Sequence, residues 1–270
     1  MRWGVFSDIH GNLPALRAVL AELDRFGAER YAYLGDLVGY GPHPDEVVAA
    51  VADLEPLIVA GNHDLAVVGR LRMDWFAPVP RACLEWTVRT VRAETVEYLR
   101  ALPRTAALGG ARLVHALPPD SATTYLTTDV LPEVGAAVDR WRESLSFVGH
   151  THRPQCVALP PRPASPGGGG EVPGAEDCAA DGVGACGASL ILQPLPARWS
   201  APPAPYRALV NLGSVGQPRD GDPRAFCALW DDDRRTLESR RVAYDIEQTI
   251  ADMNAAGLPA EPARRLRAGT

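Results

Sequence analysis

Apolar, strand-like runs alternate with amphipathic helices through the first 65 residues of the chain. Residues 3–7, 31–34 and 57–60 are short apolar runs typical of buried strands. Asn12 and Pro14 favour the start of a first helix, and a second is expected from Pro44 to Leu54. In the first helix leucines recur at helical spacing, at Leu13, Leu16, Leu20 and Leu23. This alternation predicts right-handed βαβ units, a parallel sheet and an α/β fold class.

The rest of the chain adds further expected elements. Strands are predicted at 112–114, 145–148 and 208–211, and residues 225–230 and 237–242 are expected to pair as a hairpin. Helices are expected over 80–102, over 130–143 and from residue 246 to the end. A length of 270 residues fits one large domain, so we treat residues 1–270 as a single domain.

Residues 157–206 differ from the rest in composition. Proline and glycine make up 18 of these 50 positions, including the run Ser-Pro-Gly-Gly-Gly-Gly at 165–170. Such a composition cannot build a packed core, so we predict a mostly flexible insertion within the domain, with one strand at 189–192. Cys156, Cys178 and Cys186 lie in or beside it, but their spacings match no standard zinc site.

Composition and charge exclude several classes of function. The 27 basic residues are all arginine, which excludes P-loop hydrolases, protein kinases and pyridoxal enzymes, since each needs a lysine. The net charge of −6 argues against general nucleic-acid binding. No apolar stretch is long enough for a membrane helix. The five cysteines include no C-x-x-C pair, and the first residues show no signal-peptide pattern. We therefore expect a reduced, cytoplasmic protein. The oligomeric state is left open.

Five of the six histidines lie at or just beyond the carboxyl end of a predicted strand. Carboxylates or an amide accompany them in Asp8-Ile9-His10, Gly35-Asp36, Gly61-Asn62-His63-Asp64, Leu113-Val114-His115 and Gly149-His150-Thr151-His152. Ligand sites in open α/β sheets form at the carboxyl ends of strands, so these segments are expected to converge. A single histidine at a strand end is as often an ordinary core or surface residue as it is a functional one. Five histidines in this pattern argue for a single site.

The residue types predict a metal site. Imidazole and carboxylate ligands without thiolate suit divalent Mn, Fe, Zn, Co or Ni. The donors suffice for two ions, and a carboxylate such as Asp36 can bridge them. Two metals about 3.5–4 Å apart form the clamp used in hydrolysis at phosphorus. The positive charge of such a centre would attract a negatively charged phosphoester even though the whole chain is acidic. The distant carboxylates matter little, because salt screens charges beyond about 8 Å.

In this order, the motifs D-x-H, G-D, G-N-H-D, a lone His and G-H-T-H resemble those of the calcineurin-like metallophosphoesterase family. The resemblance spans residues 5–152. The segment Asn211-Leu-Gly-Ser-Val-Gly-Gln-Pro-Arg219 is similar to a glycine turn of small bacterial members. The resemblance implies a four-layer α/β/β/α sandwich of two mixed sheets flanked by helices. Strands after residue 208 would supply part of the second sheet.

The resemblance also implies the role of each site residue. Asp8, His10 and His152 would hold one metal, and Asn62, His115 and His150 the other, with Asp36 bridging them. The cofactors would be two divalent ions, with Mn, Fe or Zn expected. A metal-bridging hydroxide would attack phosphorus in line. His63 would stabilise the phosphate charge and protonate the departing oxygen.

Other residues give weaker signals. Arg153 and Arg219 are candidates to bind a substrate phosphate, since guanidinium groups match phosphate oxygens. Tyr40 lies just beyond Asp36, where it is expected to shape the substrate pocket. His43, nearby, is interpreted as part of a plain turn. Asp64 is expected to face away from its neighbour His63, which leaves it at most a weak orienting role.

The expected function is hydrolysis of a small phosphoester by a dinuclear metal centre. The favoured interpretation is a phosphodiesterase acting on small nucleotide-like substrates, with a phosphomonoesterase or dinucleoside polyphosphate hydrolase as alternatives. A catalytically silent protein-binding scaffold of the same fold, like the retromer subunit, is the alternative from another class, and the presence of His63 favours catalysis. A metallopeptidase is set aside because the chain has no H-E-x-x-H motif.

Overall fold

The computed structural model describes residues 1–161 and 190–270. In these residues the strands form two mixed six-stranded sheets. In the first sheet, β1 pairs in parallel with β2 and antiparallel with β11. Its strands, in order, are β3 (Leu57–Ile58), β2 (Arg30–Tyr33), β1 (Arg2–Phe6), β11 (Ala225–Asp231), β12 (Thr236–Val242) and β9 (Arg198–Ser200).

The second sheet has parallel pairs at its centre and antiparallel pairs toward both edges. Strand β6 lies between β5 and β10 and is parallel to both. The strands, in order, are β4 (Thr105–Leu108), β5 (Ala111–Val114), β6 (Leu145–Val148), β10 (Arg207–Leu212), β7 (Pro154–Leu159) and β8 (Gln193–Pro194).

Eight α-helices are found in the described residues. Asn12 caps the first of them, since its side-chain oxygen accepts a hydrogen bond from Ala15 N at 3.1 Å. The helices are α1 (Leu13–Arg25), α2 (Pro44–Ala52), α3 (Asn62–Val67), α4 (Pro78–Thr90), α5 (Ala93–Ala101), α6 (Leu131–Ala136), α7 (Ile246–Ala255) and α8 (Ala260–Ala268). None of them is long and apolar enough to cross a membrane.

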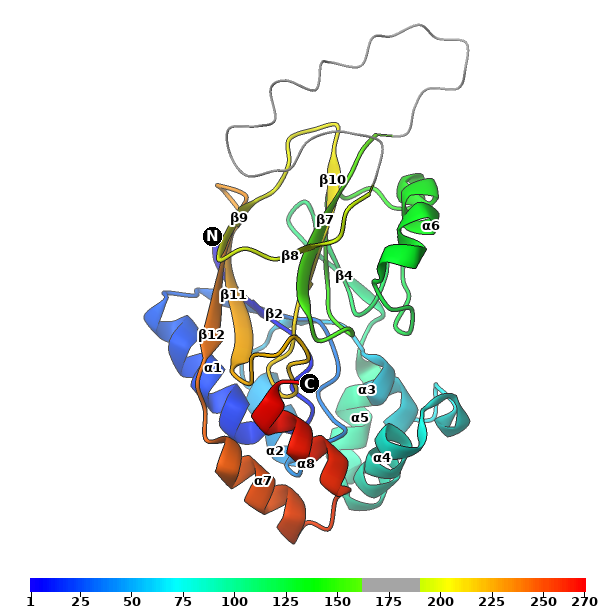
Figure 1. Ribbon diagram of the computed structural model, residues 1–270, viewed down its shortest axis with the longest axis vertical. Coiled ribbons are helices and arrows are strands. Elements are labelled where there is room, and N and C mark those ends of the chain that lie inside the picture. Colours follow the sequence, from blue (N-terminus) through cyan, green and yellow to red (C-terminus); the bar gives the residue numbers. More distant parts are fainter. Residues whose placement is uncertain (162–189) are drawn as a thin grey trace, which may run out of the picture.

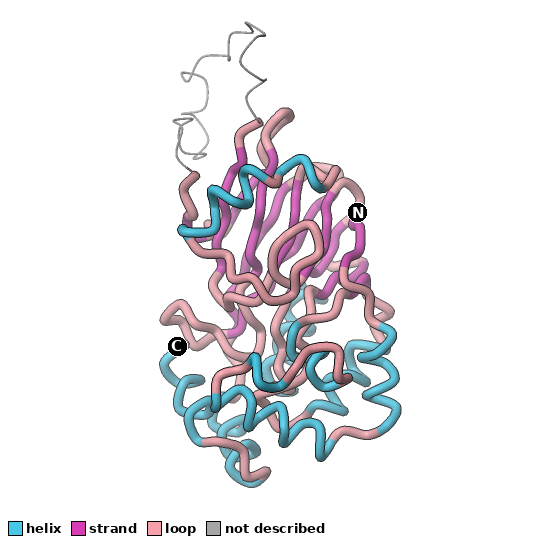
Figure 2. Tube along the Cα trace, turned by 90° about the vertical axis from the view of Figure 1, so that its right-hand side faces the viewer, coloured by secondary structure: helices cyan, strands magenta, loops and turns pink. Residues whose placement is uncertain are grey.

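The sheets pack face to face, with helices outside both. Val5 of β1 and Leu113 and Phe147 of the second sheet belong to one buried cluster between the sheets. The other face of the first sheet packs on α1, α2, α4 and α5, and the other face of the second sheet packs on α6. Figure 1 shows α1 and α6 on opposite outer sides, and Figure 2 shows most helices gathered at one end of the strands. The predicted α/β/β/α sandwich is confirmed.

Two of the predicted helices are shorter than expected. The helix predicted over 80–102 is two helices, because the backbone is extended at Val91 and Arg92. Asp45 of α2 stabilises this break by accepting a hydrogen bond from Arg92 N at 3.1 Å. The helix predicted over 130–143 ends at Ala136 and is followed by a 3₁₀ turn, and Arg207 donates to the carbonyl of Val138 at 2.8 Å.

The late strands and the final helix also differ from what the sequence predicted. Of the late strands, β10 joins the second sheet, whereas β11 and β12 extend the first. The predicted final helix is α7 and α8, separated at Gly257, whose φ is +70°.

The segment 157–206 is partly structured where it is described. Strand β8 adds to the second sheet and β9 to the first. The strand expected at 189–192 is found instead at Gln193–Pro194. Cys178, Cys186 and the glycine run lie outside the described residues. Cys156 is buried in β7, and burial raises the pKa of its thiol to about 11.

Candidate active site

The sequence motifs at the strand ends converge on one buried cluster. Asp8 and His10 follow β1, and Asp36 follows β2. Asn62 and His63 begin α3, His115 follows β5, and both His150 and His152 follow β6. Each of these eight side chains is at most 4% exposed. Residues separated by up to 144 positions thus meet in one place, as the arrangement of the strands predicted.

The backbone turns sharply at most of these residues. Eight non-glycine residues of the described chain have positive φ, and six of them are Asp8, His10, Asp36, Tyr40, His150 and His152. Asp and His adopt this left-handed conformation more readily than most residues, and its cost is tolerated mainly at functional sites. The turns are held by backbone hydrogen bonds, including those from Asp8 N to Gly35 O and from His10 N to Asp36 O, both at 3.0 Å.

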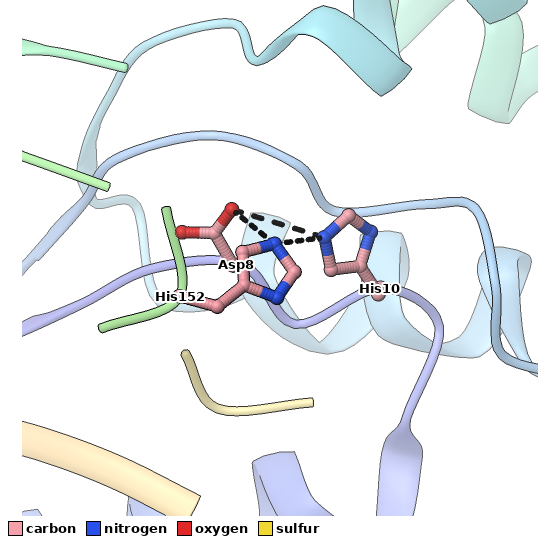
Figure 3. A group of neighbouring side chains, drawn as sticks. All are labelled: Asp8, His10 and His152. Carbon is pink, nitrogen blue, oxygen red and sulfur yellow. Dashed lines mark hydrogen bonds and ion pairs between the residues drawn. The ribbon is translucent and has the colours of Figure 1, made fainter. Parts of the chain in front are cut away.

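Asp8, His10 and His152 form the first group of possible metal ligands (Figure 3). Their side chains point toward one another. His152 Nε2 lies 3.1 Å from His10 Nε2 and 3.2 Å from Asp8 Oδ1, and His10 Nε2 lies 3.7 Å from that same oxygen. Asp8 Oδ1 is buried without a hydrogen-bond partner. Its other oxygen accepts hydrogen bonds from Ser7 Oγ at 2.5 Å and His150 N at 3.1 Å.

The tautomers of these two histidines leave their Nε2 atoms free to bind a cation. His10 Nδ1 lies 3.1 Å from Val38 O, and His152 Nδ1 lies 2.6 Å from Gln217 O. Each Nδ1 therefore donates its proton to a backbone carbonyl. Burial lowers the pKa of both rings well below the usual value, so both are neutral at pH 7. Two nitrogen lone pairs and a carboxylate oxygen then face one another, an arrangement that repels itself unless a cation lies between them.

A second group consists of Asp36, His115 and His150. His115 Nδ1 donates to Leu34 O at 2.7 Å, and its Nε2 lies 3.0 Å from Asn62 Oδ1. His150 has the opposite orientation. Its Nε2 donates to Thr123 O at 3.1 Å, which leaves Nδ1 as the possible ligand atom. Burial lowers the pKa of His150 to about 3, so this ring is neutral too.

Asp36 lies between the two groups. Its Oδ2 is 3.6 Å from His10 Nε2 and 3.4 Å from His115 Nε2. Its Oδ1 accepts a hydrogen bond from His63 N at 2.8 Å, which fixes the carboxylate. Burial alone would raise the pKa of Asp36, but His115 and His63 outweigh it and hold the pKa well below the usual value. One ionised carboxylate oxygen is therefore shared between two clusters of nitrogen ligands.

His63 lies beside this cluster, among aromatic rings. Its ring centre is 4.7 Å from that of His10, 4.8 Å from Tyr40 and 5.2 Å from Phe76. With His10 and Asp36 it forms a further group of possible ligands. Its Nδ1 is buried without a partner against Gly39, where an added Cβ would lie only 2.2 Å from that nitrogen. Burial lowers the pKa of His63 to about 4.

Asp64 has a structural role that the sequence analysis missed. Its fully buried carboxylate accepts hydrogen bonds from four backbone N–H groups, those of Gly61, Asp36, Leu37 and Val38, at 2.8–3.4 Å. It ties the loop that carries Asp36 to the start of α3. Burial and the charge of Asp36 raise the pKa of Asp64 to about 7, while the N–H donors favour its ionised form.

The glycine turn after β10 forms hydrogen bonds with the loops that carry the first group of ligands. Asn211 Nδ2 donates to Gly149 O and to Thr151 Oγ1. Ser214 Oγ donates to Asp8 O at 2.8 Å, and Gly216 N donates to the same oxygen at 2.9 Å. Gly216 allows this approach, since a Cβ there would lie 1.8 Å from Ile9 O. The turn therefore fixes the strained backbone at Asp8.

The three weaker candidates, Arg219, Tyr40 and Arg153, differ in how they contact the cluster. Arg219 donates to Tyr40 Oη at 3.2 Å, and its positive charge contributes to the low pKa of His63 and His152 after the larger effect of burial. Tyr40 is buried and contacts the rings of His10 and His63. Arg153 follows His152 directly but is exposed. His43 lies at the start of α2, where its Nε2 is 3.4 Å from Asp252.

Comparison with known proteins assigns the chain to a family. The model of the calcineurin-like phosphoesterase family matches residues 1–165, more than half of the chain. The chain belongs to this family. It is therefore a metal-dependent phosphoesterase, as the sequence motifs predicted.

Two relatives match nearly the whole phosphoesterase chain, and a third matches less than half of it. A metallophosphoesterase of Sphaerobacter thermophilus has a similar structure, with a TM-score of 0.77, 36% identity and coverage of 100% of this chain and 99% of the other. An uncharacterized protein of Methanocaldococcus jannaschii is 31% identical over 98% of this chain and 97% of its own. A symmetrical bis(5′-nucleosyl)-tetraphosphatase of Coxiella burnetii is 35% identical over 126 residues, which are 43% of this chain and 42% of that protein. Membership in an enzyme family favours the hydrolase over the scaffold.

Proposed function

We propose that this chain hydrolyses small phosphodiesters with two divalent cations. Asp8, His10 and His152 would hold one, and Asn62, His115 and His150 the other. The observation that carries the proposal is the position of Asp36, whose Oδ2 lies within 3.6 Å of ligand nitrogens from both groups. The partnerless Asp8 Oδ1 and the histidine tautomers fit a bound cation. Bound there, the two ions would supply Lewis-acid stabilisation of the phosphoryl oxygens and an acidified water.

The residues around the cluster would bind and protonate the substrate. Arg219, with Tyr40 beside it, is positioned to bind a phosphate oxygen. The single positive charge of Arg219 matches the single negative charge of a phosphodiester, whereas a phosphomonoester carries about two negative charges. Arg153 is a more exposed candidate for the far end of the substrate. His63 is neutral in the free protein, but the charge of a bound phosphate favours its protonated form. It would then donate its proton to the departing oxygen.

The substrate we favour is nucleotide-like. The Coxiella burnetii relative, a nucleosyl tetraphosphatase by name, supports this choice, and it makes a dinucleoside polyphosphate the second candidate. A phosphomonoester is the third. Manganese, iron and zinc all suit the nitrogen and oxygen ligands. The cytoplasmic location expected from the sequence stays a prediction.

Metal removal and reloading test the proposal. After chelation we expect no hydrolysis of bis(4-nitrophenyl) phosphate, and after reloading with Mn²⁺, Fe²⁺ or Zn²⁺ we expect activity and two ions per chain by mass spectrometry of the metal content. The rate should exceed that with 4-nitrophenyl phosphate, while parallel assays with dinucleoside tetraphosphate test the second candidate. A maximum of one ion per chain would contradict the dinuclear mechanism, and faster monoester cleavage would contradict the diesterase preference.

Metal uptake should also depend on pH through His115. Burial lowers the pKa of this ring, but Asp36 outweighs burial and raises the pKa to about 9 in the metal-free protein. At pH 7 the ring is therefore protonated, and a ligand histidine must lose that proton. We expect uptake to release about one proton and metal affinity to rise about tenfold per pH unit up to about pH 9. Calorimetry in buffers of different ionisation enthalpy measures the release, and uptake without it would show that His115 is not a ligand.

A further inference from the structure

Tyr125 stacks on one of the proposed metal ligands. Its ring centre lies 4.1 Å from that of His150, and the two planes are inclined by only 24°. Tyr125 is nevertheless 45% exposed as a residue, which makes it one of the few large, exposed apolar residues of the described chain. Because one face of the ring covers an imidazole that is itself buried, the exposed surface lies directly beside the candidate active site.

The loop that carries Tyr125 is held in place on both sides of it. Ser121 Oγ accepts hydrogen bonds from Thr123 N and Thr124 N at 3.2 and 3.1 Å. Thr123 O accepts the proton of His150 Nε2, and Leu126 is buried in the core outside the second sheet. Tyr125 therefore lies between two anchored neighbours. An aromatic ring that is fixed before binding loses little entropy when a ligand stacks on it.

Tyr125 and Tyr40 each contact histidines of the buried cluster, since Tyr125 stacks on His150 and Tyr40 contacts the rings of His10 and His63. Burial raises the pKa of Tyr40 to about 12, and the nearby Tyr125 phenol adds to this effect while Arg219 opposes it. Tyr40 and Arg219 are hydrogen-bonded to each other beside the position proposed for the substrate phosphate, whereas Tyr125 lies on the His150 side of the cluster. A substrate whose phosphate lies at the two metal groups would extend its organic part across these side chains.

We propose that Tyr125 is a specificity-determining residue that stacks on the aromatic base of a nucleotide-type phosphoester. This inference rests on the proposed function, because it places the base relative to the phosphate site. Stacking on an aromatic side chain tolerates every base, so it selects for the presence of a base rather than for its identity. A sugar phosphate without a base would use the phosphate site alone.

Binding of two product-like ligands to the Mn²⁺-loaded protein tests the inference. Adenosine 5′-monophosphate and ribose 5-phosphate both carry the ribose phosphate, and the adenine distinguishes them. By calorimetry we expect the wild type to bind the adenosine ligand about tenfold more tightly. Tyr125→Ala should abolish this preference while leaving affinity for ribose 5-phosphate and metal content unchanged, and Tyr125→Phe should retain it. Val88→Ala, which removes an exposed apolar side chain from α4, is the matched control.

The outcomes separate this inference from the proposed function. Equal affinity of the wild type for both ligands would overturn the stacking role alone. If Tyr125→Ala weakened both ligands equally and lowered the metal content, Tyr125 would only position His150, and the inference would also fall. If neither ligand bound and no diester was hydrolysed, the proposed function itself would fail, and this inference with it.

Discussion

Replacing His63 by glutamine should lower kcat by about 10²–10⁴ for a dinucleoside monophosphate, whose leaving group is a sugar alkoxide. Glutamine keeps a hydrogen-bond donor but cannot transfer a proton. The ring of His63 lies beside His10 and Tyr40, and its backbone N–H holds Asp36. Because that backbone contact survives the substitution, the position of Asp36 and the metal content should not change.

The leaving group distinguishes proton donation from charge stabilisation. A nitrophenolate departs with little need for a proton, so His63→Gln should cost far less with bis(4-nitrophenyl) phosphate than with the dinucleoside monophosphate. His43→Gln is the matched control, since His43 lies at the start of α2 and pairs with Asp252. It should leave both rates unchanged.

Two results would contradict this role for His63. An equal loss with both substrates would mean that the ring stabilises the phosphate charge without donating a proton. A fall in metal content would mean that His63 is a ligand together with His10 and Asp36, a group that their geometry also permits.

The convergence of the strand-end motifs could be predicted from the sequence, for a simple physical reason. Parallel strands linked by right-handed helical connections place their carboxyl ends at one edge of a sheet. Any polar residue two or three positions beyond such a strand, such as Asp8 or Asp36, is therefore brought to that edge. The hairpin of β11 and β12 was predictable too, because both strands and the turn between them have clear local patterns.

The surroundings of these residues could not be predicted, because they depend on contacts between distant parts of the chain. The break between α4 and α5 is stabilised by Asp45, which lies 47 positions away from Arg92. The insertion of β11 beside β1 depends on pairing across more than 220 positions. Tyr125 gave no signal in the sequence, since its stacking on His150 arises only when the second sheet forms.

Asp64 illustrates the same limit, because its four partners lie up to 28 positions away. Replacing it by alanine should destabilise the protein by about 3–5 kcal/mol, since four buried N–H groups lose their acceptor and each unsatisfied group costs about 1–3 kcal/mol without full additivity. The melting temperature should fall by about 10 °C in thermal unfolding followed by circular dichroism. Asp74→Ala, which removes an exposed carboxylate paired with Arg72, is the matched control and should leave the melting temperature nearly unchanged.

The same substitution should weaken metal binding even though Asp64 is not one of the proposed metal ligands. Asp36 has a φ of +64°, and its backbone N–H donates to Asp64. Without that acceptor the strained turn can relax, and Asp36 Oδ2 then leaves its position between His10 and His115. If Asp64→Ala proves too unstable to purify, Asp64→Asn retains one acceptor oxygen and should give a smaller loss of both stability and metal content. A variant as stable and as metal-rich as the wild type would show that the loop holds Asp36 without this carboxylate.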